Sequence, residues 1–152
     1  MIIADADQMR ALGARVAGLC QPGDVIVLNG DLGSGKTTFV QGLGSGLGVS
    51  EPITSPTFVI ARHYSGSLGN RLTHVDAYRL GSGLELDDLD LDAELASCIT
   101  AVEWGAPHAN RIAHDRLDIS IDTLEDGSRE VSIVGVGQRW AGVDLATLEP
   151  VA

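Results

Sequence analysis

The sequence predicts an α/β domain with a mainly parallel central sheet and antiparallel hairpin additions. Short apolar runs bounded by turn residues alternate with segments of helical periodicity, which is typical of a parallel sheet with crossover helices. Two pairs of apolar runs flank short polar turns, which predicts two hairpins. The length of 152 residues is that of one globular domain.

The chain begins with a predicted amphipathic helix and a buried strand. The stretch "ADQMRALGARVAGL", residues 6–19, repeats apolar side chains at helical spacing, and Asp5 with Gln8 has the spacing of a capping box. After the turn "QPGD", the run "VIVL" at 25–28 is typical of a strand buried on both faces. The apolar positions of the helix are Met9, Leu12, Val16 and Leu19.

A second helix is predicted after a glycine-rich loop, in the segment "TTFVQGLGSGLG" at 37–48. Its predicted buried face consists of Phe39, Val40, Leu43 and Leu47. Each of the three internal glycines of the segment weakens a helix by about 1 kcal/mol relative to alanine. Packing must therefore hold this helix together.

The remainder of the chain is predicted to contain two hairpins, an acidic helix and a third buried strand. The first hairpin joins "PTFVIARHY" (56–64) to "RLTHVDAYRL" (71–80), and the second joins "RLDISID" (116–122) to "REVSIVGV" (129–136). Between them lie "LELDDLDLDAEL" (84–95), which has helical period, and the strand "CITAVEW" (98–104). The domain is expected to span residues 1–137, and the weak pattern of the tail at 138–152 is typical of a mobile segment.

Composition and charge restrict the class of function. The formal charge is -11, from 21 Asp and Glu against 10 Lys and Arg, so the surface repels phosphate backbones and argues against direct tRNA binding. Two cysteines are too few for a disulfide framework, and no apolar run is long enough to span a bilayer. The N-terminus lacks the pattern of a secretory signal. We therefore expect a cytoplasmic protein with reduced thiols and no membrane contact.

The stretch "GDLGSGKTT" at 30–38 carries the strongest chemical signal. Gly30, then Gly35, Lys36 and Thr37 match the spacing G-x-x-x-x-G-K-[ST], between a strand and a helix as a P-loop requires. Glycines at 33 and 35 let successive N–H groups face a phosphate, and the helix N-terminus adds positive potential. Lys36 is expected to reach the β- and γ-phosphate oxygens of a nucleotide, and the Thr37 hydroxyl to bind Mg²⁺.

Two acidic residues close apolar strands and are candidates to complete the metal site and to support hydrolysis. Asp76 ends "LTHVD" and Glu103 ends "CITAVE", where a parallel sheet delivers residues to the crevice at its carboxyl edge. The alternative for each is an ordinary acidic residue exposed at a strand end. His74, on the same strand as Asp76, is favoured as a packed, hydrogen-bonded neighbour.

Three nearby features have two interpretations each. Arg79 could pair with a carboxylate or with phosphate, and Trp104 could pack in the core or lie close enough to report nucleotide binding. Tyr78 belongs to the same polar cluster, "HVDAYR". The acidic segment from Glu85 to Glu94 is most simply a solvated helix face, with a docking surface as the alternative.

Four blocks together resemble the TsaE (YjeE) family of bacterial P-loop ATPases. They are "GDLGSGKTT", "SPTF" at 55–58, "HVDAYRL" at 74–80 and "VEWG" at 102–105, in an order and spacing that match over most of the chain. The resemblance implies a three-layer P-loop NTPase fold and an ATPase that supports synthesis of threonylcarbamoyladenosine in tRNA. It also implies action with the TsaD and TsaB proteins, which would hold the tRNA.

The resemblance also assigns roles to residues. It implies that Asp31, Leu32, Gly33, Ser34, Gly35, Lys36, Thr37 and Thr38 hold the phosphates of ATP. It makes Glu103 the second magnesium ligand beside Thr37, and Asp76 a group needed for hydrolysis. Ser55 and Thr57 would then sense the γ-phosphate as a switch segment, whereas the residues alone would predict a turn before a strand.

Three functions compete at this point. The first is a Mg²⁺-dependent ATPase that is slow until its partners dock. The second is a small-molecule kinase, although the chain has no obvious Arg-rich lid over the phosphates. The third is a regulatory subunit that only binds nucleotide, and the coincidence of Asp76 and Glu103 argues for turnover instead. A guanine-nucleotide switch is disfavoured because no N-K-x-D sequence is present.

Overall fold

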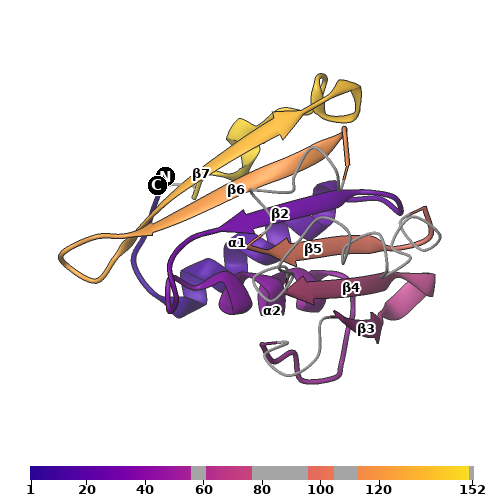
Figure 1. Cartoon of the computed structure of the whole chain (residues 1–152), viewed down its shortest axis with the longest axis horizontal. Coiled ribbons are helices and arrows are strands. Elements are labelled where there is room, and N and C mark those ends of the chain that lie inside the picture. Colours follow the sequence, from indigo (N-terminus) through magenta and orange to yellow (C-terminus); the bar gives the residue numbers. More distant parts are fainter. Residues whose placement is uncertain (56–60, 77–95, 105–112, 151–152) are drawn as a thin grey trace.

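A single mixed sheet organises the computed structural model, which describes residues 1–55, 61–76, 96–104 and 113–150 (Figure 1). Within these ranges the sheet has seven strands in the spatial order β1-β7-β6-β2-β5-β4-β3. The strands are β1 (Ile2–Ile3), β2 (Val25–Asn29), β3 (Ala61–Ser65), β4 (Arg71–Asp76), β5 (Ile99–Glu103), β6 (Arg116–Thr123) and β7 (Arg129–Val136). The helices among the described residues are α1 (Ala6–Leu19) and α2 (Lys36–Gly46).

The centre of the sheet is parallel and its edges are antiparallel. β6, β2, β5 and β4 run parallel to one another, whereas β3 pairs antiparallel with β4 and β7 pairs antiparallel with β6 and β1. This confirms the predicted mainly parallel centre with hairpin additions. The carboxyl ends of the four parallel strands meet at one edge of the sheet, the edge where α/β domains place their sites.

Helix α1 forms where its local sequence predicts. Its bounds coincide with the predicted stretch 6–19, and the Asp5 side chain caps it by accepting a hydrogen bond from the Gln8 N–H at 2.8 Å. The Gln8 side chain accepts from the N–H of Ala4, one residue earlier than in the usual capping box. Three of its four predicted apolar positions are fully buried, and Leu19 packs at the margin of the core.

Helix α2 packs against α1, so both helices lie on the same face of the sheet (Figure 1). The predicted buried face of α2 is confirmed, since Phe39, Val40 and Leu43 have no exposed surface. The predicted helix at 84–95, which would supply a layer on the other face, lies outside the described residues. The three-layer arrangement therefore stays a prediction.

Glycines at the helix crossing have a packing role that the sequence did not reveal. A Cβ atom added to Gly42 of α2 would collide with the backbone carbonyl of Arg10 in α1, and one added to Gly13 would collide with the carbonyl of Phe39. The backbones of the two helices are therefore in close contact. The helix-weakening effect predicted for Gly42 is the cost of this close approach.

Both predicted hairpins are present in the described residues. β3 and β4 are joined across residues 66–70, which include the short 3-10 turn η1 (Ser67–Gly69), and β6 and β7 across residues 124–128. The first part of the predicted strand at 56–64 and the end of the predicted strand at 71–80 lie outside the described residues.

The tail after residue 137 is anchored to the core at two points. It forms two 3-10 turns, η3 (Gln138–Trp140) and η4 (Leu145–Leu148), and buries Trp140 and Leu148 to 3% and 1% exposure. Arg139 also donates two 2.8 Å hydrogen bonds to the buried carboxylate of Asp24, at the start of β2. Among the described residues, no helix has the length and apolar character needed to cross a bilayer.

Candidate functional site

The glycine-rich loop, residues 30–35, lies at the carboxyl edge of the sheet between β2 and α2. Gly33 and Gly35 have φ values of +79° and +113°, a backbone region that residues with side chains rarely adopt. Gly35 is the N-cap residue of α2, so no side chain caps the first turn of that helix. The free N–H groups of a first helical turn attract anions.

Lys36 is the only lysine in the sequence, and it is buried beside the loop. Its Nζ donates hydrogen bonds to the carbonyl oxygens of Gly30 (2.7 Å) and Asp31 (2.9 Å) and lies 4.1 Å from the centre of the Trp104 ring. Burial lowers the pKa of this ammonium below its ordinary value of 10.5, while the carboxylates of Glu103, Asp31 and Asp76 act in the opposite direction. A negatively charged ligand at this position would raise the pKa of Lys36 again, because it favours the charged form.

Two predicted acidic residues come together on neighbouring parallel strands. Asp76 of β4 and Glu103 of β5 are register partners, and they are 6% and 3% exposed. The alternative of exposed acids at strand ends is therefore wrong. Glu103 Oε1 accepts a hydrogen bond from the Thr37 hydroxyl at 3.1 Å, which joins the end of β5 to the first turn of α2.

His74 lies behind Glu103 and is completely buried. Its Nε2 is 3.3 Å from Glu103 Oε2, an ion-pair distance without hydrogen-bond geometry. His74, Glu103 and Thr37 thus form a chain from the interior to the glycine-rich loop. The predicted packing of His74 is therefore confirmed, but the predicted hydrogen bond is not, because both ring nitrogens are buried without a hydrogen-bond partner among the described residues.

Trp104 follows β5 in a strained conformation. Its φ of +63° is uncommon for a residue with a side chain, and such residues cost on the order of 1 kcal/mol. The backbone N–H of Trp104 donates to the carbonyl of Leu28 at 2.9 Å, which fixes the turn. The turn places the indole ring over Lys36 and outside the core cluster, so the alternative of a core residue is wrong. That Trp104 reports nucleotide binding stays a prediction.

Residues from the glycine-rich loop, the start of α2 and the end of β5 line one cavity of about 210 Å³. Its walls are formed by Leu32, Gly33, Gly35, Lys36, Thr37, Thr38, Ser55, Glu103, Trp104 and Arg129. Most predicted site residues therefore line one cavity, although Asp31, Ser34 and Asp76 do not form its walls. Thr57, Tyr78 and Arg79 lie outside the described residues.

Sequence reasoning missed Arg129, the first residue of β7. Its guanidinium donates to the carbonyl oxygens of Ser34 (3.2 Å) and Gly33 (3.3 Å), 95 and 96 residues earlier in the chain. No local pattern could have indicated this contact, because it depends on how the second hairpin is placed relative to the loop.

The donor set suits Mg²⁺ held together with phosphate. The described residues contain no cluster of three or more His, Cys, Asp and Glu side chains that could hold a metal alone. Thr37 and Glu103 supply two oxygen donors, and Mg²⁺ typically takes one or two protein ligands beside water and phosphate. The residues present therefore fit the predicted magnesium site.

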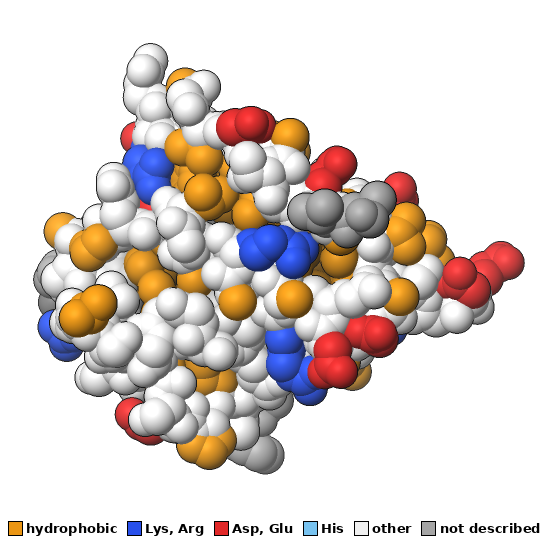
Figure 2. Space-filling view, turned by 180° about the vertical axis from the view of Figure 1, so that it is seen from behind, with side chains coloured by type: hydrophobic (Ala, Val, Ile, Leu, Met, Phe, Trp, Pro, Cys, Tyr) orange, Lys and Arg blue, Asp and Glu red, His pale blue; other side chains and the backbone are white. Residues whose placement is uncertain are grey.

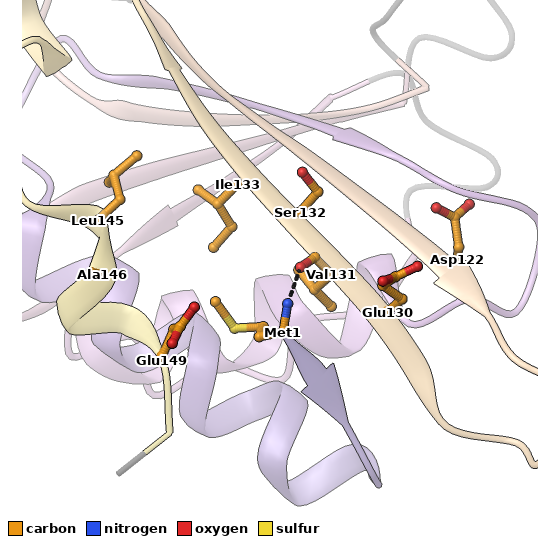
Figure 3. A pocket seen from close by; sticks show the side chains of 9 residues that line it. All are labelled: Met1, Asp122, Glu130, Val131, Ser132, Ile133, Leu145, Ala146 and Glu149. Carbon is orange, nitrogen blue, oxygen red and sulfur yellow. Dashed lines mark hydrogen bonds between the residues drawn. The ribbon is translucent and has the colours of Figure 1, made fainter.

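A larger cavity of about 450 Å³ lies between β7 and η4, away from the glycine-rich loop (Figure 3). Its walls carry the carboxylates of Asp122, Glu130 and Glu149, and Asp122 and Glu130 are cross-strand register partners. Carboxylates repel a phosphorylated ligand. The smaller cavity with Lys36 and Arg129 is therefore the better candidate for an anion.

The fold and the smaller cavity define the class of protein: a mixed α/β domain whose strand, glycine-rich loop and helix form a candidate anion site at the carboxyl edge of the parallel strands. Comparison with known families identifies the family within this class. The sequence model of TsaE, described as "Threonylcarbamoyl adenosine biosynthesis protein TsaE", matches residues 3–131. The chain belongs to the TsaE family.

Relatives and a solved structure support this assignment. The tRNA threonylcarbamoyladenosine biosynthesis protein TsaE of Streptomyces coelicolor is 49% identical over 146 residues, covering 92% of this chain and 99% of its own. The protein of the same name from Bacillus subtilis is 36% identical over 88% of this chain and 84% of its own. The crystal structure of Bacillus subtilis YdiB matches with a TM-score of 0.74 and 32% identity, covering 92% of this chain and 86% of that one.

Proposed function

We propose that the protein is a P-loop, Mg²⁺-dependent ATPase that serves the biosynthesis of threonylcarbamoyladenosine in bacterial tRNA. The observation that carries the proposal is one cavity in which the glycine-rich loop, Lys36 and the Thr37–Glu103 pair converge. The names of the family and of its relatives support the biosynthetic role.

The loop and the start of α2 would bind the phosphates of ATP. Residues 31–38 would surround them with backbone N–H groups, and Lys36 would exchange its two loop carbonyls for β- and γ-phosphate oxygens. Thr37 and Glu103 would hold Mg²⁺ between them. Bound there, Mg²⁺ would neutralise charge on the phosphate oxygens during transfer.

Hydrolysis also requires a group that orients the attacking water. Asp76 is the candidate, because it is buried beside Glu103 at the same edge of the sheet. Ser55 lines the cavity and begins the segment that we propose as a γ-phosphate sensor, to which Thr57 also belongs. Release of that segment after hydrolysis would change the surface beside the nucleotide.

The proposed partners are the TsaD and TsaB proteins in the cytoplasm, with tRNA reached only through them. The net charge of -11 disfavours direct tRNA binding. On the face drawn in Figure 2, basic side chains of the described residues stand in separate places, with acidic side chains among them and toward the rim. A partner with basic surface would be needed to hold the RNA.

ATP hydrolysis by the purified chain tests the proposal. We expect Mg²⁺-dependent release of phosphate that is slow for the chain alone and faster with TsaD, TsaB and tRNA. Transfer of phosphate to a small molecule would instead indicate a kinase. Binding of ATP without turnover, with or without partners, would indicate a regulatory subunit.

A further inference from the structure

Arg129 ties the second hairpin to the glycine-rich loop. Its three guanidinium nitrogens each donate to a backbone carbonyl: Nε to Ser34, Nη2 to Gly33, and Nη1 to Gly127 in the turn before β7. A single planar group thereby joins the turn at residues 124–128 to the loop. Arginine suits this task, because its donors lie in a fixed fork that lysine lacks.

The turn that carries Arg129 is itself held by hydrogen bonds. Asp126 Oδ1 accepts from the backbone N–H of Ser128 at 2.9 Å and from its hydroxyl, and the N–H of Leu124 donates to the carbonyl of Ser128 at 2.8 Å. Residues 129–136 then continue as β7 in register with β6. The guanidinium therefore extends from a well hydrogen-bonded hairpin, from which it can restrain the glycine-rich loop.

The contact with the loop has a direct consequence for its N–H groups. In a trans peptide the carbonyl and the next N–H point in opposite directions. A donor that holds the Ser34 carbonyl on the Arg129 side therefore turns the Gly35 N–H the other way. An anion-binding loop requires this polarity, with N–H groups facing the ligand and carbonyls facing away from it.

The loop has particular need of such a restraint. Gly33 and Gly35 have unusually wide backbone freedom, and fixing them costs more entropy than fixing other residues. If Arg129 fixes these two glycines before a ligand binds, the free energy of binding does not have to cover the entropy cost of ordering them. Arg129 also joins Lys36 as one of two cationic side chains among the described residues that line this cavity.

We infer that Arg129 is a positioning residue that orders the glycine-rich loop before an anionic phosphate ligand binds, acting through the Gly33 and Ser34 carbonyls. For a nucleoside triphosphate as the ligand, the inference rests on the proposed function. The ordering itself does not, because it belongs to the ligand-free protein.

The test compares Arg129→Ala and Arg129→Lys with the wild type and with Arg116→Ala. Arg116 is a matched control, because it too donates to a backbone carbonyl, that of Ala113, and to the Asp118 carboxylate as well, but it lies at the start of β6, at the opposite end of the hairpin from Arg129. NMR order parameters of the Gly33, Ser34 and Gly35 amides are measured without nucleotide, and the Kd of a non-hydrolysable ATP analogue is measured by calorimetry. Arg129→Gln replaces the alanine variant if that variant does not fold.

We expect both Arg129 variants to reduce the loop order parameters from the rigid range, about 0.85, toward about 0.6. The Kd should rise about tenfold in both, with kcat at saturating ATP little changed, since the loop can still be ordered at a cost. Arg116→Ala should match the wild type in both measurements.

Unchanged order parameters in Arg129→Ala would overturn the inference, even if affinity falls, because Arg129 would then act by charge alone. Restored affinity in Arg129→Lys would overturn it for the same reason. A wild-type chain that binds no ATP analogue would refute the proposed function instead, and the order parameters would still decide the role of Arg129.

Discussion

At the scale of single residues, the pKa of the Lys36 ammonium is a property of the candidate site that can be measured directly. The ammonium is buried, and that burial lowers its pKa. It donates hydrogen bonds to two loop carbonyls, which a phosphate ligand would replace as acceptors. Because the sequence has one lysine, its side-chain NMR signals have no overlap with other lysines. The position can therefore be followed directly through binding.

We predict that Lys36→Ala abolishes tight ATP binding and turnover, and that ATP analogue raises the pKa of Lys36 in the wild type. The physical reason for both is that phosphate oxygens favour the charged ammonium, which burial disfavours. Calorimetry and an NMR pH titration of the lysine, with and without analogue, measure the two effects. Unchanged affinity and hydrolysis in a folded Lys36→Ala protein would refute the P-loop assignment.

Glu103 should separate binding from chemistry. We predict that Glu103→Ala and Glu103→Gln reduce Mg²⁺-dependent hydrolysis at least about tenfold, with a much smaller effect on nucleotide affinity, because backbone N–H groups still hold the phosphates. Phosphate release and calorimetry measure the two quantities. The glutamine variant keeps an oxygen that can accept from Thr37.

The Glu103 variants also have a readout independent of turnover. The Glu103 carboxylate raises the pKa of Lys36, so its removal should lower that pKa further. A lost melting transition in both variants would show that Glu103 acts through stability, contrary to the proposal.

At the scale of elements, the crossing of α1 and α2 explains why α2 carries a glycine at position 42. Gly42 faces the Arg10 carbonyl so closely that no side chain fits between the two backbones. Gly18, by contrast, is exposed on α1 with no heavy atom within 4 Å of an added Cβ. The two positions form a matched pair, because the same substitution has opposite consequences.

We predict that Gly42→Ala destabilises the fold by about 1–3 kcal/mol through forced separation of the helices, despite the better helix propensity of alanine. Gly18→Ala should stabilise it by roughly 0.5–1 kcal/mol. Urea unfolding of both variants provides the comparison. Equal shifts of the two midpoints in the same direction would contradict the close approach.

The same elements show what sequence patterns could and could not predict. The bounds of α1 and the carboxyl-end positions of Asp76 and Glu103 followed from capping, periodicity and strand patterns, which are local properties. The packing role of Gly42 and the contacts of Arg129 with the loop depend on tertiary placement, so no local pattern contains them. The left-handed turn at Trp104 was also beyond prediction, because tryptophan has no preference for it.

At the scale of the whole molecule, the candidate site lies at the carboxyl edge of the parallel strands, and the tail contacts the opposite, amino end of β2. Arg139 holds Asp24 at the amino end of β2, whereas the glycine-rich loop follows its carboxyl end. Trp140 and Leu148 complete the core under β7.

The proposed partnership makes a prediction about the complete protein. Because tRNA is disfavoured by the charge of -11, the energy of ATP would have to reach the RNA chemistry through protein contacts. ATP held by Lys36 and Thr37 would favour one arrangement of the surface beside Ser55 and Trp104, and hydrolysis would release it. We therefore predict that the protein binds the TsaD–TsaB pair at least about tenfold more tightly with an ATP analogue than without nucleotide, a coupling of ordinary allosteric size.

Calorimetry of the protein with the TsaD–TsaB pair measures this coupling, with and without the analogue. Lys36→Ala is the control, because it should bind the pair equally in both conditions, at the nucleotide-free affinity of the wild type. Equal affinities for the wild type in the two conditions would contradict nucleotide-gated docking. A parallel titration with tRNA alone should show only weak binding that fades as salt rises. Tight tRNA binding by the isolated chain would contradict the charge argument, because a surface this acidic could then hold RNA only through a basic site of its own.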